Sequence, residues 1–215
     1  MTPAILFAAV LLLALLIYAE KYESTAWKLA SKPLLSALFI LAASLQTWQT
    51  PSLAHWVLAG LILSWVGDVS LIFDSRKLFL AGLVAFLLGH VCYAAGFYTH
   101  GVLNGWIAAG LAVLLAVGAA IFVWLRPHLG SMTGPVIGYI LVISVMVGGA
   151  LGVYLNPQWA QGARLMVLAG GVMFYLSDIM VARDQFVDSA FINRLVGLPL
   201  YYGAQFLFAY TLGRF

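Results

Sequence analysis

The sequence predicts an all-α polytopic membrane protein: a single integral membrane domain, residues 1–215, formed by a bundle of eight transmembrane helices. Of its 215 residues, 64% are hydrophobic and only 8% are charged, whereas a soluble domain carries about 25% charged residues. Ten basic and seven acidic side chains cannot cover the surface of a soluble domain of this length. Apolar runs recur along the whole chain, each long enough to cross a hydrocarbon core of about 30 Å at about 1.5 Å per residue. A water-soluble protein is therefore excluded.

Eight apolar runs define the expected spans, at residues 3–19, 33–48, 55–73, 78–98, 106–125, 134–155, 164–182 and 195–213. The first run lacks the positively charged start of a signal peptide and leads directly into the second, so we expect it to be retained. The joints are too short to hold a soluble domain. Several contain helix-breaking residues: Lys32-Pro33, Thr50-Pro51, Asp74-Ser75, Arg126-Pro127 and Asn156-Pro157.

The basic residues predict the orientation, because lysine and arginine near span ends are retained on the cytoplasmic side. The joints after the first, third, fifth and seventh runs hold eight basic residues, whereas the opposite side holds only Arg164 and Arg214. We therefore expect a multi-pass protein of the cell membrane, in a bacterium the inner membrane, with both termini outside the cytoplasm. The eight residues are Lys21, Lys28, Lys32, Arg76, Lys77, Arg126, Arg183 and Arg194.

The sixth run carries small residues at a spacing of four, at Gly134 and Gly138 and again at Gly148 and Gly152. Residues four apart lie on one helix face, where small side chains let membrane helices approach closely. We interpret both pairs as helix-packing positions.

Two carboxylates lie inside expected spans, Asp68 in the third and Asp178 in the seventh. A charged side chain at the centre of a membrane helix costs about 2.5–3.5 kcal/mol on insertion scales, so such residues are uncommon and are functional candidates. Both aspartates lie about one turn, roughly 6–8 Å, below the cytoplasmic boundary. At this shared depth we expect one of the two to be protonated. A buried structural hydrogen bond is the simpler alternative for each.

Other polar side chains reach the same depth. Tyr139 lies in the sixth run, Tyr201 and Tyr202 lie in the eighth, and Gln205 follows one turn deeper. Pro199 interrupts the backbone hydrogen bonds just before the tyrosines, which favours a polar cavity there, open toward the cytoplasmic side. Five basic residues near its mouth are able to meet a phosphate, although topology alone also explains them: Lys28, Lys32, Lys77, Arg183 and Arg194. The candidate substrate-binding residues are Lys32, Tyr139, Ser177, Arg183, Tyr201, Tyr202 and Gln205.

The remaining polar residues are weaker candidates. His90, in the middle of the fourth run, favours packing over a ligand role, and Asp74, Asp184 and Asp188 are interpreted as solvated charges in joints. No histidine–acid metal spacing, phosphate-binding glycine loop or nucleophile elbow occurs. The scattered basic residues and a net charge of +3 do not indicate a nucleic-acid partner. Neither a cofactor nor an obligate protein partner is indicated.

The two aspartate segments are 110 residues apart, about half the chain, and share the pattern aromatic, apolar, small, aspartate. This similarity is compatible with two four-helix halves of equal orientation, related about the membrane normal. Independent origins of the two segments remain the alternative.

Several motifs together resemble the YhhN family of membrane lysoplasmalogenases. They are Lys32-Pro33-Leu34 in the second run, Gly67-Asp68-x-x-Leu71 in the third, Ser177-Asp178 in the seventh and Leu198-Pro199-Leu200-Tyr201-Tyr202 in the eighth. The resemblance implies an ether hydrolase that cleaves the vinyl-ether bond of lysoplasmalogens, releasing a fatty aldehyde and glycerophosphoethanolamine or glycerophosphocholine. Its substrate would be a lysophospholipid in the membrane. The implied catalytic residues are Asp68 and Asp178, without a metal.

The two intramembrane aspartates fit that chemistry, because cleavage of a vinyl ether needs an acid and a base. A neutral carboxylic acid can protonate the alkene, while an ionised carboxylate stabilises the resulting cation and activates water. Which aspartate takes which role is open at this point.

Three other functions are compatible with intramembrane aspartates. A proton- or ion-coupled transporter would use them as an ion relay, but it would need polar residues on both sides of the midplane, and the outward halves of the runs are nearly bare. An intramembrane aspartyl protease would show Gly-x-Gly-Asp, and Trp65 stands where the first glycine belongs. A structural protein would gain nothing from two costly carboxylates.

Overall fold

The computed structural model describes residues 2–214, which form eight α-helices and one short 3-10 helix, with no strand among them. The helices follow one another with short connections. They are α1 (Thr2–Lys21), α2 (Thr25–Ser44), α3 (Pro51–Ser70), α4 (Arg76–His100), α5 (Gly105–Leu129), η1 (Gly130–Met132), α6 (Thr133–Tyr154), α7 (Gln161–Phe186) and α8 (Phe191–Thr211).

Six stretches are long and apolar enough to cross a membrane. Five of them are α1, α2, α3, α4 and α7, and the sixth, Gly105–Tyr154, contains both α5 and α6. Helix α8 is not among the six, because Asn193, Arg194 and Gln205 lower its hydropathy. The prediction of an all-helical, multi-pass membrane protein is confirmed, and the prediction of eight separate spans is met only in part.

Two of the predicted joints are wrong. Lys32 and Pro33 lie inside α2, which begins at Thr25, and Pro127 lies inside α5. Proline removes one helical hydrogen bond, but a membrane helix tolerates it where neighbouring groups satisfy the freed backbone. Pro51, by contrast, occupies the first turn of α3, where its missing N–H costs nothing.

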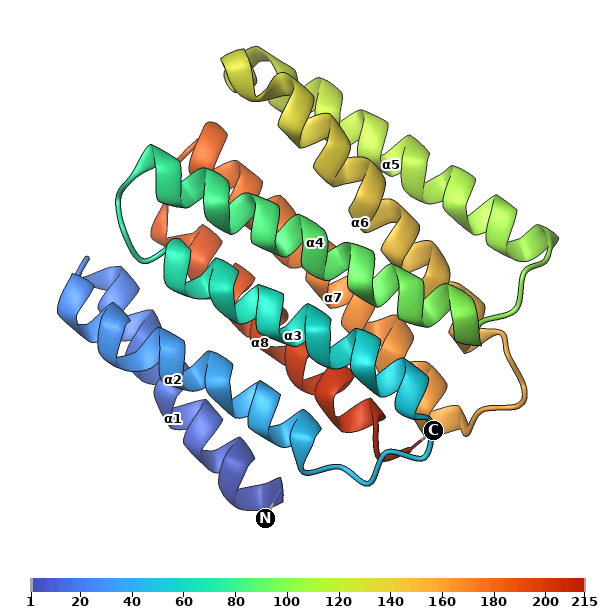
Figure 1. Ribbon diagram of the computed structural model, residues 1–215. Coiled ribbons are helices and arrows are strands. Elements are labelled where there is room, and N and C mark those ends of the chain that lie inside the picture. The colour runs from blue at the N-terminus through green and yellow to red at the C-terminus, as the bar shows by residue number, and fades with distance from the viewer. Residues whose placement is uncertain (1, 215) are drawn as a thin grey trace.

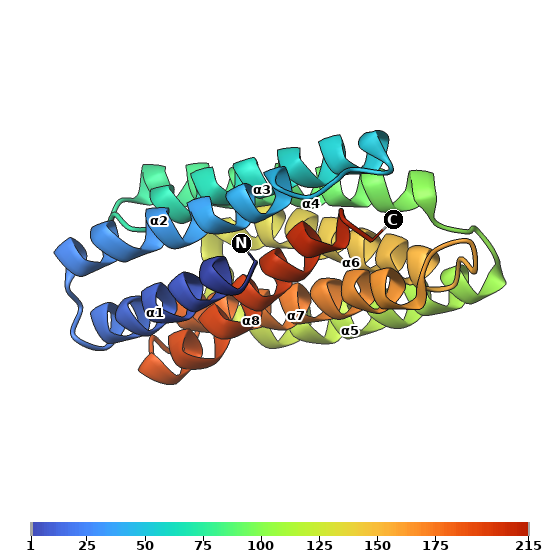
Figure 2. The ribbon, with the colours of Figure 1, turned by 90° about the horizontal axis from the view of Figure 1, so that it is seen from below.

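The helices form an elongated bundle of alternating direction (Figure 1). Both marked termini lie at one end, and the joints α1–α2, α3–α4, α5–α6 and α7–α8 lie at the other, which we call the joint end. Helix α8 packs against α1, α2, α3 and α7, while α5 lies at the margin beside α6 and α7 (Figure 2). Most of the basic residues used for the orientation therefore gather at one end, as the alternation of spans requires.

Large apolar side chains cover the outside of the bundle. Phe7 and Val10 on α1 and Val113 and Val123 on α5 are each more than 60% exposed. An apolar exterior of this extent is suited to lipid and not to water.

The glycines of α6 divide into two groups. A side chain at Gly148 would collide with Tyr98 of α4, so the predicted close helix contact is confirmed there, and Gly149, which was not predicted, makes the same approach. Gly152 instead lies against the connection after α4, where a Cβ would be 3.0 Å from the carbonyl oxygen of Val102. A side chain at Gly134 or Gly138 would meet nothing within 4 Å, so the same prediction is wrong for this pair. The reason is that α4 and α6 converge toward the end with the termini and diverge toward the joint end (Figure 1).

Candidate active site

A cavity of about 990 Å³ opens at the joint end and receives side chains from all eight helices. Its size is at the upper end of the range for ligand pockets, about 300–1,000 Å³. Charged residues of both signs surround the mouth, and the interior is mostly apolar. Both Asp68 and Asp178 line this cavity.

Asp68 is enclosed by polar partners and is only 2% exposed. Its Oδ2 accepts hydrogen bonds from Ser36 Oγ and Tyr201 Oη, both at 2.6 Å. Lys32 Nζ lies 3.4 Å from Oδ1. A cation and two hydroxyl donors are the surroundings that a buried negative charge requires.

Helix periodicity explains the partners from α2. Lys32 and Ser36 are four residues apart, so they lie on one face of α2, toward Asp68 of α3. Tyr202 does not line the cavity, but its hydroxyl lies 3.1 Å from Ser36 Oγ and so supports this serine. Lys32, expected at a joint, is instead a buried member of the site.

Asp178 has fewer polar partners and a more open position, with a side chain that is 17% exposed. Tyr139 Oη donates to its Oδ2 at 2.9 Å. His90 Nε2 lies 3.6 Å from the same oxygen, just beyond hydrogen-bond length. Among residues 2–214, no lysine or arginine forms an ion pair with Asp178.

The two aspartates share one cavity but not one hydrogen-bond network. Tyr201, which donates to Asp68, packs edge-on against Phe174 at 5.4 Å between ring centroids. Phe174 in turn packs on His90 at 4.5 Å. The aromatic ring of Phe174 therefore lies between the partners of Asp68 and the partners of Asp178.

The structure brings only part of the predicted binding set to the cavity. Lys32, Tyr139, Ser177 and Tyr201 line it, although Ser177 Oγ is already used in a hydrogen bond to the carbonyl of Gly197 at 3.0 Å.

Three further members of the predicted set lie away from the cavity wall: Arg183, Tyr202 and Gln205. Arg183 donates to Asn193 at 2.7 Å, and Gln205 is buried deeper, where it accepts a hydrogen bond from Tyr93 at 2.7 Å. Of the basic residues predicted at the mouth, Lys28 and Arg194 line it and Lys77 does not.

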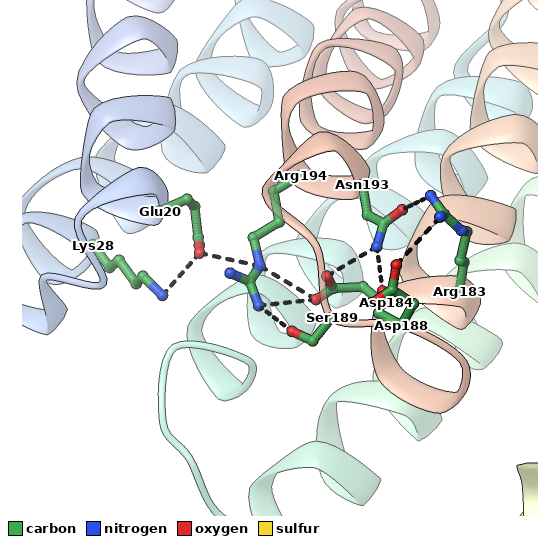
Figure 3. Close-up of polar contacts among 8 residues, drawn as sticks. All are labelled: Glu20, Lys28, Arg183, Asp184, Asp188, Ser189, Asn193 and Arg194. Carbon is green, nitrogen blue, oxygen red and sulfur yellow. Dashed lines mark hydrogen bonds and ion pairs between the residues drawn. The ribbon is translucent and has the colours of Figure 1, made fainter.

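Acidic residues at the mouth were missed by the sequence interpretation. Glu20 lies between Lys28 Nζ at 2.8 Å and Arg194 Nε at 3.6 Å, as Figure 3 shows. Arg194 also pairs with Asp184 at 3.1 Å, so the interpretation of Asp184 as a solvated joint charge is wrong. These contacts connect α1 and α2 with α7 and α8 across the mouth.

Of two further residues beside the aspartates, Ser36 was missed and His90 was interpreted as a packing residue. Ser36 had a usable signal, because it lies one helical turn after Lys32. The sequence does not place His90 beside Asp178, since a lone histidine in an apolar run does not reveal which helix it faces. The position of His90, 3.6 Å from Asp178, follows from its packing against Tyr139 of α6 and Phe174 of α7.

The fold and the cavity define a class: a multi-pass helical membrane protein with a two-carboxylate site at one end of its bundle. Within this class the chain belongs to the YhhN family, whose sequence profile matches residues 25–212. No solved structure matches the chain.

Several similar proteins carry a name that includes an activity. The chain is 30% identical over 174 residues to "Lysoplasmalogenase TMEM86A" of Bos taurus, covering 80% of this chain and 71% of that protein. It is 32% identical over 155 residues to "Lysoplasmalogenase" of Mycobacterium bovis, covering 69% of this chain but only 55% of the relative. It is also 26% identical over 210 residues to the membrane protein YhhN of Escherichia coli O157:H7, covering 96% and 97% of the two chains.

Proposed function

We propose that this protein is a lysoplasmalogenase, which hydrolyses the vinyl-ether bond of a lysoplasmalogen to a fatty aldehyde and a glycerophospho-ethanolamine or -choline. The observation that carries the proposal is that two intramembrane aspartates with different partners line one cavity with a charged mouth and an apolar interior. The YhhN family and the lysoplasmalogenases among its relatives support the same conclusion.

Asp178 is the proposed acid. It has no lysine or arginine partner among the described residues, so it is the carboxyl that loses least by carrying a proton. Its proton passes to the alkene carbon farther from the ether oxygen, and a C–H bond replaces the carboxyl O–H bond. The positive charge left behind is shared between the neighbouring carbon and the ether oxygen.

Asp68 is the proposed carboxylate, because Lys32 and two hydroxyls stabilise its negative charge. It stabilises the cation and takes one proton from the water that attacks the oxygen-bearing carbon. The product is a hemiacetal. When the hemiacetal breaks its bond to the glycerol oxygen, that oxygen receives the proton from Asp68, and the hydroxyl proton of the hemiacetal returns to Asp178. Atoms and charges then balance, and no cofactor takes part.

The mouth is the proposed place of the polar headgroup. Lys28, Arg76 and Arg194 line it and offer donors for a phosphate. The vinyl ether then lies deeper, near the two aspartates, and the apolar tail lies in hydrocarbon.

The membrane arrangement is part of the proposal. All eight helices cross the bilayer, the joint end faces the cytoplasm, and both termini lie outside it. Helices α1–α4 and α5–α8 are two related halves, supported by equivalent contacts: α8 packs on α2 as α4 packs on α6. Each aspartate also has one neighbour on the preceding helix and one on the last helix of the other half. For Asp68 these are Ser36 on α2 and Tyr201 on α8. For Asp178 they are Tyr139 on α6 and His90 on α4.

A transporter is less well supported by this geometry. Beyond the aspartates lies a cluster of packed aromatic rings, whose neighbouring centroids are 4.8–6.3 Å apart: Tyr93, Phe97, Phe174 and Phe208. This packing favours a cavity that opens at the joint end rather than a path through the bundle.

The direct test compares two substrates with the same headgroup and chain length. Purified protein in detergent is expected to release free aldehyde from a lysoplasmalogen and no fatty acid from the corresponding acyl lysophospholipid. An ester has no alkene to protonate, so it is the matched control. Absence of aldehyde release in protein that is folded by circular dichroism would contradict the proposal.

A further inference from the structure

The cavity is too shallow beyond the aspartates to hold a lipid tail. Tyr175 is the innermost residue of α7 on its wall, three residues from Asp178, which is about 4.5 Å along a helix. A tail that anchors a lysolipid in one leaflet has to reach across about half of a hydrocarbon core of about 30 Å, or about 15 Å. With its vinyl ether at Asp178, such a tail has to leave the cavity sideways.

The wall of α4 that faces α6 and α7 is apolar near Asp178. Phe79 and Leu83 line the cavity there and lie on the same face of α4 as His90. Neither Phe79 nor Leu83 carries a polar group. A hydrocarbon chain therefore meets no desolvation cost along this wall.

The same two helices separate at this level. The face of α6 that holds Gly148 and Gly149 in contact with α4 continues toward the joint end as Gly138 and Gly134. There, a space of at least 4 Å stays free at each glycine. Figure 1 shows the ribbons of α4 and α6 diverging toward the joint end. We call the region between Leu83 of α4 and Gly138 of α6, beside Tyr139, the α4–α6 opening.

A second apolar hollow follows the same pair of helices farther from the joint end. It has a volume of about 340 Å³ and is lined by Val91, Ala94, Ala95 and Tyr98 of α4 and Leu141, Val142 and Val145 of α6. It begins at the level of His90 and Tyr139, which flank Asp178. A chain that leaves through the α4–α6 opening therefore has an apolar surface to follow toward the bilayer centre.

We propose that the α4–α6 opening is the binding site for the hydrocarbon tail of the lysolipid and its route between the cavity and the bilayer. The substrate lies with its headgroup at the mouth, its reactive bond at the aspartates and its tail between α4 and α6. This inference rests on the proposed function for the identity of the substrate, and it adds the path of the tail.

The first experiment fills the opening. In Gly138→Phe the new ring occupies the free space between α4 and α6, whereas Gly105→Phe adds the same ring at a glycine on α5 that also has nothing within 4 Å. Aldehyde release is measured with lysoplasmalogens of long and short alkenyl chains. For Gly138→Phe, kcat/KM is expected to fall about tenfold or more with the long chain, a free-energy difference of about 1.4 kcal/mol, and to stay near wild type with the short chain. Gly105→Phe is expected to behave as wild type with both.

Retained short-chain activity shows that Gly138→Phe is folded. An equal loss with both chain lengths, or no loss with either, would contradict the proposed tail site. A change in oligomeric state without a change in chain-length preference would also contradict the tail site. The α6 face around Gly138 would then be an interface between two copies of the protein. If Gly138→Phe fails to fold, Gly134→Leu provides the same comparison with a smaller side chain.

The second experiment does not depend on hydrolysis. A lysolipid with a saturated ether link, which cannot be cleaved, carries a photoreactive diazirine in its tail and is cross-linked to wild-type protein. Mass spectrometry is expected to find adducts concentrated in residues 79–98 and 134–145. Adducts spread over all lipid-facing helices alike would overturn the tail site. If adducts concentrate in these segments but no vinyl ether is hydrolysed, the proposed function fails and the tail site stands.

Discussion

The two aspartate sites, similar in sequence pattern, differ in their surroundings. Asp68 is 2% exposed and has a lysine and two hydroxyls around it. Asp178 has one hydroxyl donor, a histidine at 3.6 Å and a side chain that is 17% exposed. A buried carboxylate stays charged only where partners replace its lost hydration, so these surroundings favour opposite protonation states. This difference is the basis for proposing Asp178 as the acid and Asp68 as the base.

The largest expected effect comes from removing either carboxylate. Asp68→Asn and Asp178→Asn are each expected to lower kcat for aldehyde release by about 10²–10⁴-fold, because each removes one partner of general acid–base catalysis. The matched control is Asp188→Asn, since the side chain of Asp188 is 60% exposed and lies away from the cavity. If either intramembrane variant keeps full activity, that residue is not catalytic.

Replacing Lys32 sharpens the contrast in charge. Lys32→Met leaves Asp68 buried without its cation, and breaking a buried ion pair in this way costs about 3–5 kcal/mol of stability. The double variant Lys32→Met/Asp68→Asn is expected to be more stable than Lys32→Met alone, because Asp68→Asn removes the buried charge that has lost its partner. Denaturant or thermal unfolding in detergent measures both variants. A Lys32→Met protein as stable as wild type would show that Asp68 carries no charge.

Smaller effects on stability are expected when the tyrosine beside each aspartate, Tyr201 or Tyr139, is replaced. Tyr201→Phe removes a hydrogen bond to the proposed carboxylate, which is worth about 1.5–3 kcal/mol, whereas Tyr139→Phe removes one to the proposed neutral acid, worth about 0.5–1.5 kcal/mol. The unfolding free energy of Tyr201→Phe is therefore expected to fall further. The reverse order would exchange the roles assigned to Asp68 and Asp178.

The smallest effect is expected at the mouth. Arg194 lines the cavity and Arg183 does not, although both belong to the network in Figure 3. Arg194→Ala is expected to raise KM several-fold, consistent with loss of about 1 kcal/mol of phosphate binding, while Arg183→Ala leaves KM near wild type. Steady-state kinetics with one lysoplasmalogen suffices, and equal KM values for the two variants would remove Arg194 from the headgroup site.

Much of the site was predictable because burying polar groups in lipid is costly. Asp68, Asp178, Tyr139 and Tyr201 stand out from apolar runs on that ground alone, and all four line the cavity. The rise of about 1.5 Å per residue along a helix placed them at one depth. Lys32 also lines the cavity, but it was expected at a joint. The same argument wrongly placed Arg183, Tyr202 and Gln205 on the cavity wall, because depth along a helix does not specify the direction in which a side chain points around the helix axis.

The linear order of residues established the helical fold, the lipid-facing exterior and the two intramembrane carboxylates, because these depend on composition and on spacing along one helix. It did not establish that Lys32 and Ser36 meet Asp68 while His90 meets Asp178, or that α4 leaves Gly138 uncovered. These features depend on which helix faces which and at what angle. Contacts between residues far apart in the chain arise only from packing, and they are what makes the surroundings of the two aspartates different.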